Sequence, residues 1–277
     1  MAIDLHAASW SFNAMKTLGE ILSDWVRAQR RADDQPLLLM LSGAQGIGKS
    51  TAMRQLARDI PGLVTLGLDD FYLTQAERRS LADRVHPLFE TRGPPGTHDL
   101  ALLNQVLDQL LSGAPTSLPV FDKASDDRCP PSDWPWVSEP PKVILLEGWM
   151  IGALPDAGAP MSAPFNAVEA QDEQGHWRSY QERALADGYA KLWDLADAFC
   201  HLCAPDFSAV LNWRLQQEES NLGLLPGTLP DKRRLWVARF IQHYERITRR
   251  MLAGGRRSGL AIHLDAQRRV VATHQSS

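Results

Sequence analysis

The stretch that decides the fold runs from Leu37 to Ser50 and reads LLLMLSGAQGIGKS. Its first part, Leu37 to Leu41, is an unbroken apolar run, which predicts a short strand covered on both faces. Residues 43–48 are rich in glycine and predict a loop. Residues 49–60 then predict a helix, because their pattern ends at Pro61 and Gly62, which cannot continue one. Strand, glycine loop and helix make up a first βα unit.

The glycine loop fits the pattern G-x-x-x-x-G-K-[ST], which is typical of phosphate-binding loops. Glycines let backbone N–H groups turn toward phosphate oxygens, the positive end of the next helix points at them, and the lysine adds a mobile cation. A chance match in a chain of this length is on the order of one in a hundred, given ordinary residue frequencies. We therefore favour a nucleotide site over a plain glycine turn. The residues expected to hold the nucleotide phosphates are Gly43, Ala44, Gln45, Gly46, Ile47, Gly48, Lys49, Ser50 and Thr51.

The rest of the chain alternates short apolar strands with helical patterns. Strands are expected at 63–68, 143–146 and 260–264, and helices at 14–31, 99–112, 178–198, 207–219 and 232–252. This alternation predicts an α/β fold with three layers, in which helices cover both faces of a mostly parallel sheet. We expect a single domain over residues 1–277, with a leading helical segment at 1–34. Residues 154–176 are rich in Pro, Gly and Ala and predict a flexible insertion.

Composition narrows the class of partner. The 277 residues carry 29 basic and 33 acidic side chains, for a formal charge of -4, so no strong field favours nucleic acid or an anionic membrane. The leading apolar run is far shorter than the roughly 20 residues that cross a bilayer, and no basic-then-apolar leader opens the chain. Three cysteines cannot form a full disulfide framework. We expect a cytoplasmic protein that acts on a small molecule, of unknown oligomeric state.

Acidic residues follow two of the predicted strands. Asp69 and Asp70 come after the strand at 63–68, and Glu147 comes after the strand at 143–146. The carboxyl ends of strands are where α/β sheets bind ligands. A small-molecule kinase needs one acid to orient the acceptor hydroxyl and another to organise Mg²⁺. Asp69 and Glu147 can fill these roles, and strand alternation predicts that only one of Asp69 and Asp70 faces the site. The alternative for the other of these two is a turn or cap residue, and the alternative for Glu147 is a solvated strand-end acid.

Further segments resemble one family of kinases. They are, in chain order, LDDFY at 68–72, RGPPGTHD at 92–99, FDK at 121–123 and LEGW at 146–149. Together with the phosphate loop, these segments resemble the D-glycerate 3-kinase family of P-loop kinases, which is related to uridine kinase, phosphoribulokinase and bacterial pantothenate kinase. The resemblance covers nearly the whole chain, and the segments around 92–99 and 147–149 are its specific part.

The resemblance implies ATP-dependent phosphorylation of a small hydroxylated acceptor, with D-glycerate as the named candidate. By position, Asp69 matches the family's catalytic base and Glu147 matches the acid near Mg²⁺. The Ser50 hydroxyl would also bind Mg²⁺, and Lys49 would neutralise phosphate charge. Arg214 matches a lid helix, within a lid region at 207–234, where it would reach the transferring phosphoryl group. The residues implied at the acceptor are Arg92, His98, Asp99, Asp122, Lys123 and Arg128. Of these, the two arginines could give a carboxylate a bidentate cation, so we expect an anionic hydroxy acid.

Two stretches depart from the family's pattern. Residues 124–128 read ASDDR, where plant and fungal members have a glycine-containing stretch that ends in GDR, and residues 243–247 read HYERI in place of a YPAY pattern. Both stretches lie in or near regions that could shape the acceptor pocket. The alternative acceptors are therefore pantothenate, a nucleoside or another sugar acid. Outside the kinases, the alternative is an ATP-binding regulator that acts on a macromolecular partner.

Overall fold

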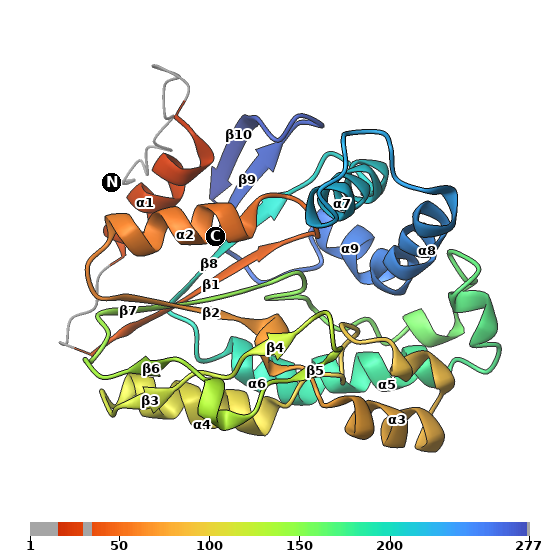
Figure 1. Ribbon diagram of the computed structural model, residues 1–277, viewed down its shortest axis with the longest axis horizontal. Helices are drawn as coiled ribbons and strands as arrows, with labels where there is room; N and C mark the ends of the chain where they lie inside the picture. Colours follow the sequence, from red (N-terminus) through yellow and green to blue (C-terminus); the bar gives the residue numbers. More distant parts are fainter. Residues whose placement is uncertain (1–15, 30–34, 276–277) are drawn as a thin grey trace, which may run out of the picture.

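The computed structural model describes residues 16–29 and 35–275, and within them the chain folds around a six-stranded sheet in the order β10-β9-β8-β1-β7-β2 (Figure 1). The five strands from β2 to β9 in this order are parallel, and β10 pairs with β9 antiparallel, which confirms the mostly parallel sheet. The strands are β1 (Leu37–Gly43), β2 (Leu63–Gly67), β7 (Val143–Gly148), β8 (Ala198–Cys203), β9 (Leu260–Leu264) and β10 (Val270–Gln275).

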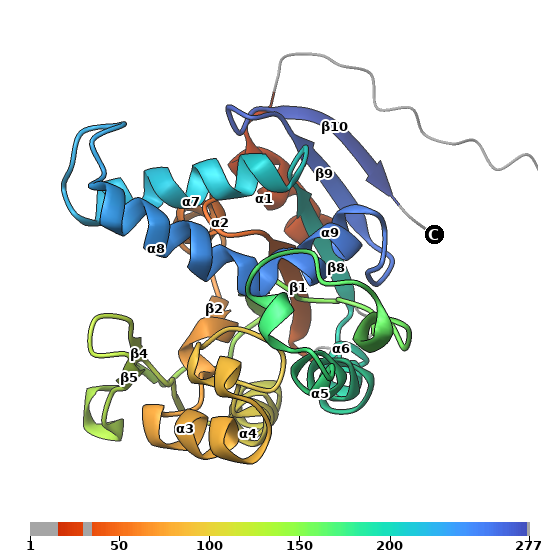
Figure 2. The same cartoon turned by 90° about the vertical axis from the view of Figure 1, so that its right-hand side faces the viewer.

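Helices cover both faces of the sheet, as the sequence predicts. One face carries α1 (Leu18–Ala28) and α2 (Lys49–Asp59), and the other carries α4 (Leu100–Leu111), α5 (His176–Ala184) and α6 (Ala190–Trp193). A further group gathers beyond the carboxyl ends of β1 and β2, where Figure 2 shows α7 and α8 side by side; it consists of α7 (Phe207–Asn221), α8 (Asp231–Ile241) and α9 (Glu245–Leu252). This group forms a helical cover over the end of the sheet where α/β proteins bind ligands.

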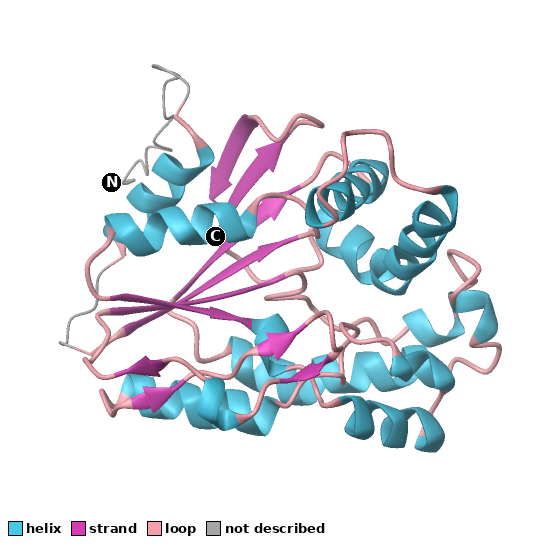
Figure 3. Ribbon diagram, viewed as in Figure 1, coloured by secondary structure: helices cyan, strands magenta, loops and turns pink. Residues whose placement is uncertain are grey.

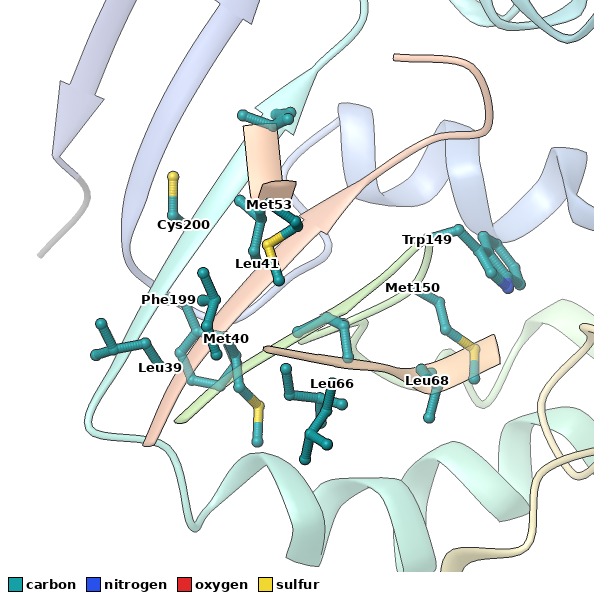
Figure 4. Packing of buried hydrophobic residues seen from close by; sticks show 14 of the residues in the cluster. Leu39, Met40, Leu41, Met53, Leu66, Leu68, Trp149, Met150, Phe199 and Cys200 are labelled. Atoms are coloured by element: carbon teal, nitrogen blue, oxygen red, sulfur yellow. The ribbon is translucent and has the colours of Figure 1, made fainter. Parts of the chain in front are cut away.

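The central strand β1 is buried on both faces. Its residues Leu38 to Leu41 are fully buried between β7 and β8. Figure 4 shows the side chains of Leu39, Met40 and Leu41 packed with those of neighbouring elements, among them Met53 of α2 and Leu66 of β2. Removing one such leucine side chain would cost about 2–5 kcal/mol. Core packing therefore holds the strand that leads into the glycine loop firmly in place.

Short elements connect these layers (Figure 3). A hairpin of β4 (Phe121–Asp122) and β5 (Asp127–Arg128) lies between α4 and β7 in the sequence, next to a two-stranded pair of β3 (Thr116–Ser117) and β6 (Trp136–Val137). The 3₁₀ turns are η1 (Leu68–Phe71), η2 (Pro87–Glu90), η3 (Pro131–Asp133), η4 (Ala159–Met161), η5 (Glu169–Gln171) and η7 (Gln242–Tyr244).

Strand β10 and helix α3 are among the elements that were not predicted from the sequence. Residues 270–275, for which no element was expected, form β10, which needs only one bonded neighbour because it lies at the sheet edge. Helix α3 (Gln75–Arg84) has few apolar residues, but it begins with a capping box in which the side chains of Thr74 and Glu77 bond each other's backbone. The capping box was the available signal, since apolar periodicity does not mark this helix.

Three predicted helices differ in their bounds. The helix expected at 14–31 is α1, which is shorter, and part of the expected range lies outside the described residues. The helix expected at 178–198 is broken by a π-helical turn, η6 (Leu185–Tyr189), and ends at Trp193 before β8. The helix expected at 232–252 is interrupted by η7.

The segment 154–176 packs against the helices beside it. The Arg178 side chain donates to the Asp172 carboxylate, and both residues are buried. Arg246 of α9 likewise donates to the buried Glu169. The flexibility expected of this segment stays a prediction, as does the division of the chain into one domain with a separate lid.

Candidate active site

The glycine loop connects β1 to α2, as predicted. Gly46 and Gly48 have φ angles of +74° and +113°, a region that side chains rarely adopt. Lys49 begins α2, and its Nζ donates to the carbonyl oxygen of Gly43 at 2.6 Å. The same Nζ lies 3.8 Å from a carboxylate oxygen of Glu147. The loop therefore joins a fixed strand to a helix N-terminus, with its lysine turned back over the loop.

Glu147 lies in the middle of the ligand-binding edge of the sheet. Strand pairing places it opposite Leu41 of β1 on one side and Gly67 of β2 on the other. Burial raises the pKa of the Glu147 carboxyl, against the opposing charge of Lys49. Within residues 16–29 and 35–275, no group of three or more His, Cys, Asp or Glu side chains could hold a metal ion. Glu147 and the exposed Ser50 hydroxyl do offer the oxygen donors that Mg²⁺ prefers, and Mg²⁺ takes its other ligands from phosphates and water.

Asp69 and Asp70 lie in η1, just past the end of β2. The Tyr72 hydroxyl donates to one Asp69 carboxylate oxygen at 2.6 Å, and Lys123 Nζ donates to the other at 2.7 Å. Burial would raise the pKa of Asp69, but the Lys123 charge and these two hydrogen bonds outweigh it and hold the pKa well below its usual range. Asp69 is therefore ionised at neutral pH.

Asp70 points elsewhere, and its carboxylate accepts from the backbone N–H of Phe121 at 3.3 Å. Burial raises the pKa of Asp70 to about 6. The two neighbouring acids thus have different partners, but the reason is not strand alternation, because both lie in a 3₁₀ turn.

The two arginines expected at the acceptor already have acidic partners. The Arg92 guanidinium pairs with the carboxylate of Asp126, which also binds the buried Arg78. Arg128 donates to Asp99 at 3.2 Å. Asp126 has a positive φ of 58°, and it lies in the ASDDR stretch where relatives were expected to carry glycine. Lys123, Asp126 and Arg128 of this hairpin pair with Asp69, Arg92 and Asp99, so each of the three cations is held by a carboxylate.

Three other residues expected at the acceptor also have partners within the fold. Asp99 caps α4 by accepting from the backbone N–H of Leu102 at 3.0 Å. The Asp122 carboxylate accepts from two backbone N–H groups of the turn that follows it. His98 is buried, its Nδ1 lies 2.6 Å from the Tyr189 hydroxyl, and burial lowers its pKa to about 4. Contact of these side chains with an acceptor stays a prediction.

Arg214 lies on α7 in the helical cover. Its guanidinium donates to Glu218 at 2.8 Å and lies over the ring of Phe240, 5.8 Å from the ring centre. Arg233 of α8 donates to the other oxygen of Glu218 at 2.6 Å. One buried carboxylate thus holds two arginines where α7 and α8 meet.

Two aromatic residues that the sequence analysis did not assign to the site hold the 92–99 segment. The Tyr244 hydroxyl donates to the carbonyl oxygen of Arg92 at 2.7 Å, and Trp149 Nε1 donates to that of Gly93 at 3.0 Å. Gly93 has a φ of +109°, and a side chain there would collide with Tyr244. Tyr244 and Arg92 are 152 positions apart, so spacing gives no signal for this contact.

Comparison with known proteins agrees with this geometry. No protein-family model matches the chain. The chain is 31% identical over 247 residues to the uncharacterized kinase mug58 of Schizosaccharomyces pombe, covering 84% of this chain and 87% of that protein. It is also 31% identical over 261 residues to the chloroplastic D-glycerate 3-kinase of Arabidopsis thaliana, covering 85% of this chain and 54% of the plant protein. A solved D-glycerate 3-kinase structure from Cryptococcus neoformans has a TM-score of 0.73 at 28% identity, covering 92% of this chain and 96% of that one.

The relatives are named as kinases. In the described part of the chain, no helix is long and apolar enough to cross a membrane. The plant relative is named as chloroplastic, so a cytoplasmic location stays a prediction here. The identity to mug58 over most of both chains, together with the similarity to the plant and fungal D-glycerate 3-kinases, shows that this protein belongs to the D-glycerate 3-kinase-like family of P-loop kinases and is an ATP-dependent small-molecule kinase.

Proposed function

We propose that this kinase transfers the γ-phosphoryl group of MgATP to a hydroxyl group of a small hydroxy acid, with D-glycerate as the first candidate. The observation that carries the proposal is the Asp69 carboxylate, which Lys123 keeps ionised at the strand end beside the phosphate loop. A relative that is 31% identical is named a D-glycerate 3-kinase, which supports the choice of acceptor.

Asp69 orients the acceptor hydroxyl and takes its proton. Each carboxylate oxygen has two lone pairs, so Asp69 can accept from the substrate while Tyr72 and Lys123 remain bonded to it. The acceptor oxygen forms its bond to the γ-phosphorus while the bond from that phosphorus to the ADP oxygen breaks, and the hydroxyl proton passes to Asp69. A low pKa suits this task, because phosphoryl transfer passes through a loose transition state in which positioning matters more than base strength.

The glycine loop and the helical cover bind the phosphate groups of the nucleotide. Backbone N–H groups of residues 43–51 hold the phosphates, and Lys49 neutralises charge on the β and γ positions. Ser50 and Glu147 would hold Mg²⁺, which supplies further neutralisation of the phosphates. Arg214 reaches the transferring phosphoryl group from α7 once a ligand competes with Glu218 for its guanidinium.

The charges beside the 92–99 segment favour an anionic acceptor. Arg78 and Arg92 share the single carboxylate of Asp126, so the three side chains together keep one positive charge. Arg78 is fully buried, which leaves Arg92 to meet a ligand. Arg92 is thus the cation that we assign to the acceptor's carboxylate, while the charge of Arg128 is balanced by Asp99. Lys123, His98, Asp99 and Asp122 complete the proposed acceptor pocket.

The test is a coupled assay of ADP release with MgATP and a panel of acceptors: D-glycerate, L-glycerate, pantothenate, uridine and several sugar acids. The Lys49→Ala variant serves as the blank. We expect slow ADP release alone and strong stimulation by D-glycerate. Stimulation by pantothenate or uridine alone would replace D-glycerate with that acceptor. If no acceptor stimulates a protein that still binds ATP, the proposed acceptor class is wrong.

A further inference from the structure

The turn between β9 and β10 touches the glycine loop from outside. Arg268 Nε donates to the carbonyl oxygen of Gly46 at 2.7 Å, across 222 positions of sequence. The same guanidinium lies over the ring of Trp213, 5.2 Å from its centre, and Trp213 Nε1 donates to the carbonyl oxygen of Ala266 at 2.8 Å. A side chain on Gly46 would lie 2.7 Å from the Trp213 backbone. The loop, helix α7 and the C-terminal hairpin thus meet at Gly46.

The backbone of Arg268 is itself unusual. Its φ of +62° is in the left-handed region, which among the described non-glycine residues only Asp126 shares. Such a conformation persists where the surrounding structure enforces it, and strained residues of this kind cluster at functional sites. The hairpin turn requires this conformation, because the N–H of Arg268 donates to the carbonyl oxygen of Asp265 and a residue with positive φ follows such a turn, and it places the guanidinium on a phosphate-loop carbonyl.

The contact fixes the orientation of one peptide group. A trans peptide is planar, and its C=O and N–H point in opposite directions. When the Gly46 carbonyl points to Arg268, the N–H of Ile47 points the opposite way, where it donates to the carbonyl oxygen of Ala44 at 3.3 Å and closes the turn of the loop. Gly46 can adopt many backbone conformations, so this peptide could otherwise flip. A flipped peptide would break the Ile47–Ala44 turn and direct the Gly46 carbonyl oxygen toward the loop interior, where anionic phosphates are proposed to bind.

We propose that Arg268 is a positioning residue of the nucleotide site, which holds the Gly46–Ile47 peptide in the orientation that binds a nucleoside diphosphate or triphosphate. The inference rests on nucleotide binding by the glycine loop, which is part of the proposed function. Arg268 acts through the loop backbone, so it affects the polyphosphate and leaves the acceptor site unchanged.

The test compares Arg268→Gly with Arg269→Gln. Glycine relieves the positive φ, so the first variant should melt at or above the wild-type temperature. Arg269 lies in the same turn, pairs with Asp265 and has a mostly exposed side chain, which makes it the matched control. We expect Arg268→Gly to bind ADP about tenfold more weakly by titration calorimetry, since a hydrogen bond from a charged donor is lost. We also expect its KM for ATP to rise while its KM for the acceptor stays unchanged.

Calorimetry separates this inference from the proposed function. If the wild-type protein binds ADP and Arg268→Gly binds it equally well, the role of Arg268 is wrong and the kinase proposal stands. If the wild-type protein binds no ADP, both fail. If Arg268→Gly melts at a lower temperature than the wild type, ADP binding is measured for Arg268→Asn instead, because asparagine also tolerates a positive φ. The same two outcomes for ADP affinity then decide the inference. An equal rise in KM for both substrates would indicate a general loss of structure and overturn the inference.

Discussion

Replacement of Asp69 by asparagine tests the proposed chemistry most directly, because the structure predicts a change in catalysis with little change in the fold. The amide can turn its oxygen toward Lys123 Nζ and its nitrogen toward the Tyr72 hydroxyl, which can also accept a hydrogen bond. Both contacts therefore survive in Asp69→Asn. The variant loses only the negative charge and the ability to take a proton.

The expected magnitudes differ sharply between stability and rate. The Asp69 side chain is 36% exposed and that of Lys123 is 59% exposed, so solvent screens the ion pair and its loss costs about 1 kcal/mol or less. For a chain of this size, that corresponds to a fall in Tm of at most about 4 °C. Proton handling by a positioned side chain is worth roughly 10²- to 10⁴-fold in rate. We therefore expect kcat to fall by about 10²-fold or more.

The assay is steady-state ADP release at saturating acceptor, with ADP binding measured by calorimetry on the same preparation. Since the glycine loop is untouched, ADP affinity should match that of the wild type. Asp70→Asn is the matched control, because its carboxylate accepts from a backbone N–H and an amide oxygen can do the same. If Asp69→Asn keeps more than about a tenth of the wild-type kcat, the role of Asp69 as the base is refuted.

Three further changes have definite outcomes. Lys49→Ala should lower kcat by about 10³-fold or more, measured as ADP release, while circular dichroism remains that of the wild type. Tyr244→Phe removes the hydroxyl that holds the Arg92 carbonyl, so KM for the acceptor should rise about fivefold while KM for ATP stays constant. Burial raises the pKa of Asp70 from 3.8 to about 6, so ionisation of Asp70 costs up to about 3 kcal/mol of stability above pH 6. This penalty is relieved as the pH falls from 6 toward 4; Asp70→Asn should therefore melt higher than the wild type at pH 7 and lose that pH dependence.

The sequence predicts the fold where local patterns are strong. An apolar run followed by glycines and a helix start identifies β1, the loop and α2, because each of these signals lies within a few residues. The prediction is weaker where one local signal is absent. Residues 270–275 look polar because an edge strand exposes most of its side chains, and α3 has a capping box without an apolar stripe.

The sequence predicts which residues belong to the candidate site better than it predicts which residues contact one another there. Motif positions bring Asp69, Glu147 and Lys49 to one end of the sheet, since parallel strands end at a common edge. The partners of these residues come from distant segments. Lys123 bonds Asp69 across 54 positions, and Arg268 bonds Gly46 across 222. Such pairs depend on how loops close over the finished sheet, and no local pattern encodes them.

The charges of the site form a set of exchangeable pairs. Each cation that we assign to phosphate or acceptor binding already faces a carboxylate: Lys49 with Glu147, Lys123 with Asp69, Arg92 with Asp126, Arg128 with Asp99 and Arg214 with Glu218. An anionic ligand that binds one of these cations therefore replaces the carboxylate that the cation already contacts. Because one ion pair is exchanged for another, the gain in affinity is limited and the arrangement favours specificity. The pair with the most exposed cation, Lys123 with Asp69, is also the one that covers the proposed base. While Lys123 and Tyr72 stay bonded to Asp69, a mobile water molecule has less access to the carboxylate than an acceptor hydroxyl that Arg92 holds in place through the acceptor's own carboxylate. The low ATP hydrolysis expected without an acceptor follows from this arrangement.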